Sequence, residues 1–123
     1  MANELQATAQ LSYNKGNARL AAQSNVSVDV AGTAYCNTTQ SIPTTDASVV
    51  FGGAGTPGYF MLQNLDATNY VDIGFDGSTY PFRLAPGTAT AGGGVMMGPN
   101  NGATIHAKAN TAACLISIQA IAP

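Results

Sequence analysis

Alternation of apolar and polar residues with a period of two is the feature that most limits how this 123-residue chain can fold. In residues 26–30, Val-Ser-Val-Asp-Val, the alternation is strict and places three valines on one face of an extended strand. Residues 5–13, 71–75, 80–84 and 112–121 alternate in the same way. No window has a helical period with caps, and the nearest, residues 15–23, is weak. The chain is therefore expected to be built from strands.

Two of these strand patterns carry more specific expectations. Pro81 cannot donate to a ladder, so the strand at residues 80–84 is expected either to lie at a sheet edge or to begin at Pro81. Residues 58–62 form a continuous apolar run, which is typical of a strand covered on both faces. In the last segment the alternation places Cys114, Ile116 and Ile118 on one face.

Turn-forming residues separate the strand patterns. In the segment 64–69, the side chains of Asn64, Asp66 and Asn69 are expected to bond nearby backbone amides and so define a tight turn. Gly77 and Gly102, which follow an Asp and an Asn, supply positions of positive φ for hairpin turns. The glycine-rich stretches 52–58 and 91–94 are expected to be flexible, exposed loops, and the first lacks the Lys-Ser/Thr end of a phosphate loop.

Short strands separated by turns predict an all-β fold, an antiparallel β-sandwich of jelly-roll-like type in a single domain. Residues 26–123 are expected to form the sandwich. Residues 1–25 are expected either to form its first strands or to extend as an arm that adds a strand to a neighbour. Candidate subunit contacts are Leu5, Leu11 and Tyr13 in the first segment, and Met96 and Met97, which are expected to be exposed.

Charged residues make up only 8% of the chain, with one His and no Trp. Catalysis needs a cluster of titratable or nucleophilic groups, which such a chain can hardly assemble. The net charge of -2 and four scattered basic residues argue against nucleic-acid binding. No apolar run approaches the roughly 20 residues that span a bilayer. The first residues do not resemble a signal peptide, so synthesis and assembly in a cytoplasm are expected.

The remaining candidates for chemistry are few. His106 and Cys36 could form a nucleophile pair, but no activating motif surrounds Cys36, and no catalytic residue is expected. His106 is expected to face away from its neighbours Ile105 and Ala107 and to be exposed. Two buried free thiols are expected for Cys36 and Cys114 in a reducing compartment, and a disulfide between them stays open.

Acidic and aromatic side chains suggest two kinds of binding site. Asp66, Asn69, Asp72 and Asp76 could suggest a calcium site, but their spacing fits no EF-hand loop, so turn capping and solvated strand positions are expected. No metal or other cofactor is therefore expected. A group of aromatic residues could stack bases or sugars, but alternation favours a place in the core for most of them. The group comprises Tyr59, Phe60, Tyr70, Phe75, Tyr80 and Phe82.

Residues 57–74, Pro-Gly-Tyr-Phe-Met-Leu-Gln-Asn-Leu-Asp-Ala-Thr-Asn-Tyr-Val-Asp-Ile-Gly, resemble a pattern of small virion proteins of tailed bacteriophages. The pattern is an apolar strand, an Asn-Leu-Asp turn and a second strand that ends in Gly. The similarity continues in residues 82–87, 105–113 and 11–17, and covers about two-thirds of the chain. The segment after Gly87 departs from it. The resemblance implies a β-sandwich that is part of the virion, without catalysis or cofactor.

Three functions follow as expectations. The first is a capsid decoration (cement) protein that packs on the phage head shell, and the second is a tail component such as a fibre, baseplate or tail accessory subunit. In both, the partners are other virion proteins, either the major capsid protein or tail subunits. Self-association into a homo-oligomer is also expected, without nucleic acid or membrane. The third is a carbohydrate-binding β-sandwich module, which the aromatic residues permit although no Trp is present.

Overall fold

A computed structural model describes residues 4–87 and 93–122 of the chain. It confirms the predicted all-β class, because antiparallel strands account for nearly all of its regular structure. The chain divides into two compact units, residues 1–32 and residues 33–123. Each unit is described by itself.

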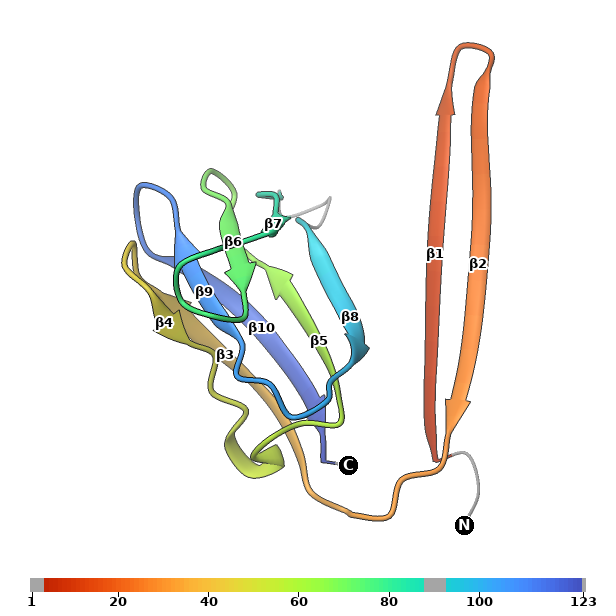
Figure 1. Ribbon diagram of the computed structural model, residues 1–123. Coiled ribbons are helices and arrows are strands. Elements are labelled where there is room, and N and C mark those ends of the chain that lie inside the picture. The colour runs from red at the N-terminus through yellow and green to blue at the C-terminus, as the bar shows by residue number, and fades with distance from the viewer. Residues whose placement is uncertain (1–3, 88–92, 123) are drawn as a thin grey trace. The chain divides into compact units, whose positions relative to one another are not determined.

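The first unit is a two-stranded antiparallel ribbon (Figure 1). Its strands are β1 (Leu5–Lys15) and β2 (Ala18–Val28), each of 11 residues. A two-residue loop joins them, and its first residue, Gly16, has φ of 59°. Tight hairpin loops need positive φ, which glycine adopts without steric cost. Residues 15–23 therefore form the end of β1, the turn and the first half of β2, and the pattern at residues 26–30 begins in β2 and runs past its end at Val28.

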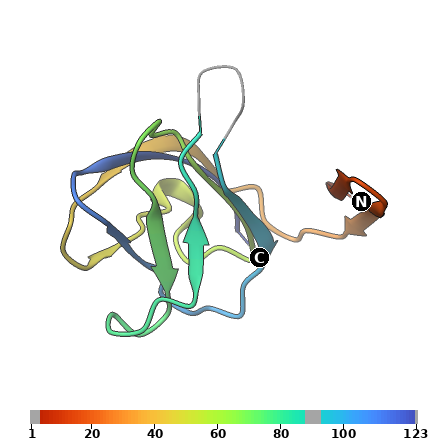
Figure 2. The same cartoon turned by 90° about the horizontal axis from the view of Figure 1, so that it is seen from above.

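The second unit is a sandwich of two four-stranded sheets (Figures 1 and 2). The first sheet has the order β3 (Tyr35–Ile42), β10 (Cys114–Ile121), β5 (Tyr59–Asn64) and β8 (Val95–Pro99). The second has the order β4 (Ala47–Ser48), β9 (His106–Ala109), β6 (Val71–Gly74) and β7 (Phe82–Leu84).

Strand pairing in the sandwich is nested along the chain. The first strand of the unit pairs with the last, β3 with β10, and the next pairs inward are β4 with β9, β5 with β8 and β6 with β7. All of these pairs are antiparallel. Eight strands paired in this way and divided between two facing sheets make a jelly roll, the fold predicted from the sequence.

The core lies between the two sheets and contains mainly small and β-branched side chains. On β10, Cys114, Ile116 and Ile118 are fully buried, as their alternation predicted. From the second sheet, Val71 and Ile73 enter the same core cluster. Interdigitation of such side chains from two inner faces is the usual construction of a sandwich core.

Two expectations about β5 and β7 had different outcomes. β7 lies at the edge of its sheet, as Pro81 predicted. The expectation that the apolar run 58–62 is covered on both faces is wrong, because burial alternates along β5. Phe60 and Leu62 face the core, whereas Tyr59 and Met61 are only half-buried on the outer side.

Within the described residues, the one helical segment is a 3-10 turn at Gly52–Ala54. It buries Ala54, and Pro57 is also buried, so the expectation of an exposed flexible loop across 52–58 is wrong at these two residues. No helix in this part of the chain has the length or the apolar character needed to cross a membrane.

Candidate interaction surfaces

The β1–β2 ribbon has one apolar and one polar face. Directly paired residues on neighbouring strands point to the same side of a sheet. The register pairs Leu11 with Ala22 and Tyr13 with Leu20, so these side chains share one face. Near the open end of the ribbon that face is completed by Leu5, Ala7, Ala9, Ser24, Val26 and Val28, and at the turn it carries Lys15 and Ala18. The opposite face carries Gln6, Thr8, Gln10, Ser12, Asn14, Arg19, Ala21, Gln23, Asn25 and Ser27.

The apolar face is exposed along most of its length. Leu11 is 63% exposed, and Tyr13 and Leu20 are about half exposed. Leu5 is half-buried, and Ala7 is the one buried residue of the two strands. The predicted contacts Leu5, Leu11 and Tyr13 therefore lie together on one face of a single-layered ribbon.

The other predicted contact residues, Met96 and Met97, lie on β8 at the edge of the first sheet. Both are half-buried rather than exposed. Met96 pairs with the fully buried Leu62 and packs against the core, so its expected exposure is wrong. Val95 is the exposed apolar residue of this edge, at 58%.

Asn64 ties together three segments where β5 ends. Its amide group donates to the carbonyls of Asn69 at 2.9 Å, Leu84 at 3.0 Å and Ala85 at 3.3 Å. Its carbonyl accepts the backbone N–H of Asp66 at 2.9 Å. The side chain is almost completely buried, at 1% exposure. Buried polar groups are stable only with such partners, so Asn64 holds the turn and the end of β7 in place.

Asp66 and Asp76 cap turns with their carboxylates. Asp66 accepts the backbone N–H groups of Thr68 and Asn69, and these bonds hold its pKa below the usual value. Asp76 accepts the N–H groups of residues 78 and 79, with the same effect on its pKa. These contacts agree with turn capping rather than calcium binding. Gly77 and Gly102 have positive φ, at 79° and 95°.

Gly93 and Gly94 pack closely against neighbouring backbone. A Cβ on Gly94 would lie 2.5 Å from the backbone nitrogen of Ala85, and one on Gly93 would lie 2.6 Å from its oxygen. Gly94 also exchanges backbone hydrogen bonds with Ala85 and Asn64. The expected flexible loop is therefore wrong for these two glycines. Residues 91 and 92 of that stretch lie outside the described part of the chain.

Most of the grouped aromatic residues lie outside the core, which corrects the expectation from alternation. Only Phe60 of the six is buried, and Phe75 and Phe82 are 44% and 46% exposed. Those two rings contact each other edge to face at 6.1 Å. Tyr70 and Tyr80 are half-buried. Val71 and Ile73, the β-branched residues of β6, occupy the inward positions instead.

The basic residues of the sandwich lie beside Asp72 in the second sheet. The register places Arg83 and Lys108 opposite Asp72 on the two neighbouring strands. Arg83 forms a 2.8 Å ion pair with Asp72, which raises the pKa of the guanidinium, and it stacks over the Tyr70 ring at 3.7 Å. This pairing offsets much of the positive charge that a nucleic acid would need.

His106, Asp46 and Tyr80 form a hydrogen-bonded cluster on the second sheet. The Tyr80 hydroxyl donates to one Asp46 oxygen at 2.5 Å, and His106 Nδ1 lies 3.1 Å from the other. The bond from Tyr80, followed by that from His106, lowers the pKa of Asp46. The same bond to Asp46 raises the pKa of Tyr80 to about 12. His106 does face away from its buried neighbours, but its side chain is only 20% exposed, so it is less accessible than expected.

Cys36, the expected partner of His106, does not lie at this cluster. Cys36 lies on β3, in the other sheet, and is buried beside Gly52. Cys114 is also buried and free, as expected, and burial raises the pKa of its thiol, which disfavours the reactive thiolate. Among residues 4–87 and 93–122, no three His, Cys, Asp or Glu side chains gather as a metal site would require.

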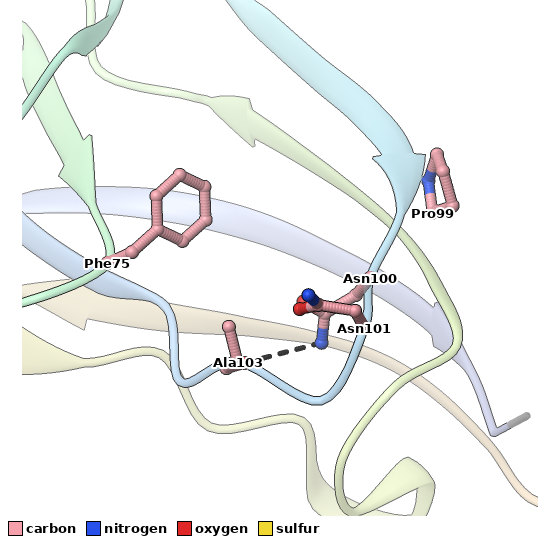
Figure 3. A pocket seen from close by; sticks show the side chains of 5 residues that line it. All are labelled: Phe75, Pro99, Asn100, Asn101 and Ala103. Carbon is pink, nitrogen blue, oxygen red and sulfur yellow. Dashed lines mark hydrogen bonds between the residues drawn. The ribbon is translucent and has the colours of Figure 1, made fainter.

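A shallow hollow of about 530 Å³ lies beside the loop that follows β8 (Figure 3). Phe75, Pro99, Asn100, Asn101 and Ala103 line it. The Asn100 amide is already committed to the carbonyls of Pro57 and Ala103. The hollow therefore offers an aromatic edge and one exposed amide, which is a sparse set of groups for a specific ligand.

Sequence reasoning did not identify the Tyr80–Asp46–His106 cluster or the Asp72–Arg83 pair, because both depend on strand register. The signal that could have suggested the ribbon surface was the alternation in residues 5–13 combined with the Gly16–Asn17 loop. No family model matches this chain, and comparison with curated proteins and with solved structures finds no significant match to either.

Proposed function

We propose that the chain is a non-enzymatic structural subunit of a tailed-bacteriophage virion, and within that class a capsid decoration protein that packs on the head shell. The observation that carries the proposal is the β1–β2 ribbon, with its long, exposed apolar face. A two-stranded ribbon is marginally stable alone in water. Such a face is useful to a protein that works inside an assembly, where neighbouring subunits cover it.

Three further observations support the proposal. The jelly roll is a fold of viral capsid domains, and it also occurs in lectins. The fold therefore favours the virion proposal but does not exclude carbohydrate binding. The resemblance to small virion proteins is strongest at residues 57–74, where Asn64 and Asp66 form the described turn. The chain also has few charges, so it can press against neighbours without desolvating many ions.

Symmetry makes modest contacts sufficient for such a subunit. When one contact is repeated across a shell, each bound copy raises the effective concentration of the next contact. A small, apolar ribbon contact is then enough for stable attachment. The tail-component alternative uses the same fold and the same contacts, so it differs only in location.

Copy number per particle separates the two. Quantitative mass spectrometry of purified virions should give a count comparable to that of the major shell protein if the chain decorates the head. A count far below it would exclude decoration and leave the tail alternative. Complete absence from particles that carry the gene would overturn the virion proposal itself.

Deletion of residues 1–15 tests the role of the ribbon in attachment. The deletion removes β1 and should leave the sandwich folded, because residues 33–123 form their own compact unit. Loss of particle binding with an intact circular dichroism spectrum is the expected result. Unchanged particle binding would show that the ribbon has no part in attachment.

A further inference from the structure

The loop between β8 and β9 contains the pair Asn101–Gly102, both of which are exposed. The Asn101 side chain lines the hollow beside Phe75 (Figure 3). Within the described part of the chain its amide has no hydrogen-bond partner, whereas the neighbouring Asn100 amide donates to two carbonyls. An exposed side chain without partners is free to rotate among its rotamers, including those that bring it towards its own backbone.

Gly102 leaves the backbone after Asn101 open to such an approach. Its φ is 95°, and a Cβ built on it would contact only the side chain of Thr56, at 3.9 Å. Its backbone N–H makes no hydrogen bond among residues 4–87 and 93–122. Because glycine has no side chain, nothing of its own shields this nitrogen, and the peptide unit rotates at little steric cost. The nitrogen can therefore reach the Cγ of Asn101.

We propose that Asn101–Gly102 is a self-modification site, at which the Asn101 amide becomes a carboxylate without an enzyme. The Gly102 nitrogen loses its proton to a base in the solvent and forms a bond to Asn101 Cγ, which closes a succinimide ring. The bond from Cγ to Nδ2 breaks, and the nitrogen leaves as ammonia with a proton from the solvent. The inference concerns the chain by itself and does not depend on the proposed place in a virion.

One water molecule then opens the ring in either of two ways. Attack at Cγ breaks the new bond to the Gly102 nitrogen and gives aspartate at residue 101. Attack at the main-chain carbonyl carbon breaks the original peptide bond and gives isoaspartate, in which the chain continues through the side chain. In both cases amide and water become carboxylate and ammonium, and no atom is oxidised or reduced.

Other asparagines of the chain lack this combination of features. Asn64 is buried, and its amide donates to three carbonyls. Asn14 and Asn37 lie in strands, whose ladders hold the backbone extended. Asn17 is exposed in the turn of the ribbon, but the residue after it is Ala18, whose Cβ hinders approach to the backbone nitrogen.

The pair Asp76–Gly77 has a similar sequence but is protected by its turn. The Asp76 carboxylate accepts the N–H groups of Ser78 at 2.9 Å and Thr79 at 2.7 Å, and these bonds lower its pKa. An ionised carboxylate resists attack by a second anionic group, and its bonds hold it towards residues 78 and 79. The same ring closure is therefore disfavoured at Asp76, and the structure distinguishes two sites that the sequence does not.

Conversion of Asn101 changes the hollow in two respects. Both products place a carboxylate beside Phe75 and add one negative charge to the net charge of -2. Isoaspartate also lengthens the main chain of the loop by one carbon. The Asn100 amide closes this loop through its bonds to the carbonyls of Pro57 at 3.0 Å and Ala103 at 3.3 Å. The longer main chain is expected to disturb these bonds.

Peptide mapping by mass spectrometry of the full chain, incubated at pH 8 and 37 °C, tests the proposal. Trypsin cleavage after Arg83 and Lys108 releases residues 84–108, whose asparagines are Asn100 and Asn101. This peptide should gain about 1 Da, and fragmentation should place the change at residue 101 in both product forms. Since a base must remove a proton, the rate should rise at least about threefold for each pH unit above 7.

Two controls keep the result specific to this pair. Asn101→Gln retains an amide but would need a larger ring, so its peptide should keep its mass. Asn17, in the tryptic peptide of residues 16–19, should convert at least about tenfold more slowly than Asn101, because its next residue has a side chain. A mass change in the peptide of Asn101→Gln, or equal rates at Asn17 and Asn101, would overturn the proposal.

The unfolded chain in guanidinium chloride shows what the fold contributes. Folded Asn101 should convert at no less than about one-tenth of its rate in the unfolded chain, because the loop leaves the pair free. Asn64 should convert only when the chain is unfolded. No conversion of folded Asn101, in the time that the unfolded chain needs to convert fully, would show that the loop protects it and would refute the assignment.

Thermal denaturation separates the effect of the charge from that of the main chain. Asn101→Asp carries the charge on a normal backbone and should melt within about 2 °C of the original chain. The isoaspartyl form, isolated by ion exchange, should melt lower than Asn101→Asp by about 4 °C or more, because its loop bonds are disturbed. Equal melting temperatures would contradict the expected change in the loop.

Discussion

Replacement of Asn64 by alanine is expected to be the most costly single polar change in the sandwich. The amide has two hydrogens, which serve three carbonyls at 2.9, 3.0 and 3.3 Å, and its oxygen accepts one backbone N–H. Alanine would leave these buried groups without partners. At about 1 kcal/mol for each of three effective hydrogen bonds, the free energy of unfolding should fall by about 3 kcal/mol. For a domain of this size the melting temperature would fall by roughly 12–24 °C.

Chemical denaturation monitored by circular dichroism measures this loss, and Asn37→Ala is the matched control. Asn37 accepts a hydrogen bond from Gln119 at an exposed position of the same sandwich. Its replacement should cost less than about 1 kcal/mol, because water can take the place of the lost partner. If Asn64→Ala cost no more than this control, the assignment of Asn64 as the centre of the turn would be refuted.

Asn64→Asp separates the hydrogen bonds from the shape of the side chain. The carboxylate has the same size but cannot donate, so at pH 7 it faces three carbonyls with a buried charge. Folding then favours the protonated acid, and its folded pKa is raised above the unfolded one. Stability relative to Asn64→Ala should therefore increase as the pH falls from 7 to 4. A pH-independent difference would count against the proposed donor role.

Three other predictions concern separate parts of the sandwich. Asp46 raises the pKa of Tyr80 to about 12. The stability that this hydrogen bond contributes is therefore complete below pH 10 and is lost as the pH rises towards 12. Urea titrations of Tyr80→Phe should lack this alkaline loss of stability. Gly94→Ala would place a methyl 2.5 Å from a backbone nitrogen and should cost more than about 2 kcal/mol. Gly98→Ala, within the β8 strand that follows Gly94, meets nothing within 4 Å and should cost under about 1 kcal/mol. A glycan array should give no hits, and hits that Phe75→Ala abolishes would favour the carbohydrate-binding alternative instead.

Much of the fold could be predicted because period-two alternation reports directly on half-buried strands. Residues 112–121 are the clearest case, since their predicted inward side chains are the buried ones of β10. The turn at 64–69 was also predictable, because Asx side chains act on nearby backbone within a few residues. Both signals come from residues close together in the sequence, so they can be read without knowledge of the tertiary structure.

β3 was not predicted because its sequence has no regular alternation of apolar and polar residues. Residues 35–42 are mostly polar, and only Cys36 and Ile42 of this edge strand are buried. The strand is held by its ladder to β10 rather than by an apolar face. The prediction that most of the aromatic residues lie in the core failed for a related reason. Alternation groups side chains by face, but it does not say which face meets the core, and the smaller Val71 and Ile73 filled it.

The candidate surface was only partly predictable. Alternation identified Leu5, Leu11 and Tyr13 as one face, but the β2 residues that share this face became known only from the register of β1 and β2. The same holds for Met96, whose pairing with Leu62 turns it towards the core. Pairing across strands is long-range information that one segment of sequence does not contain.

The position of β10 has a consequence for synthesis of the protein on the ribosome. β10 lies between β3 and β5 and supplies the central ladder of the first sheet, although it comes after the other strands of the sandwich in chain order. The first sheet cannot form its central pairs until residues 114–121 have left the exit tunnel. Until then β3 and β5 have edges without a partner strand. A nascent chain arrested before β10 should therefore be sensitive to protease and prone to aggregation, and release of these eight residues should make folding of the sandwich cooperative.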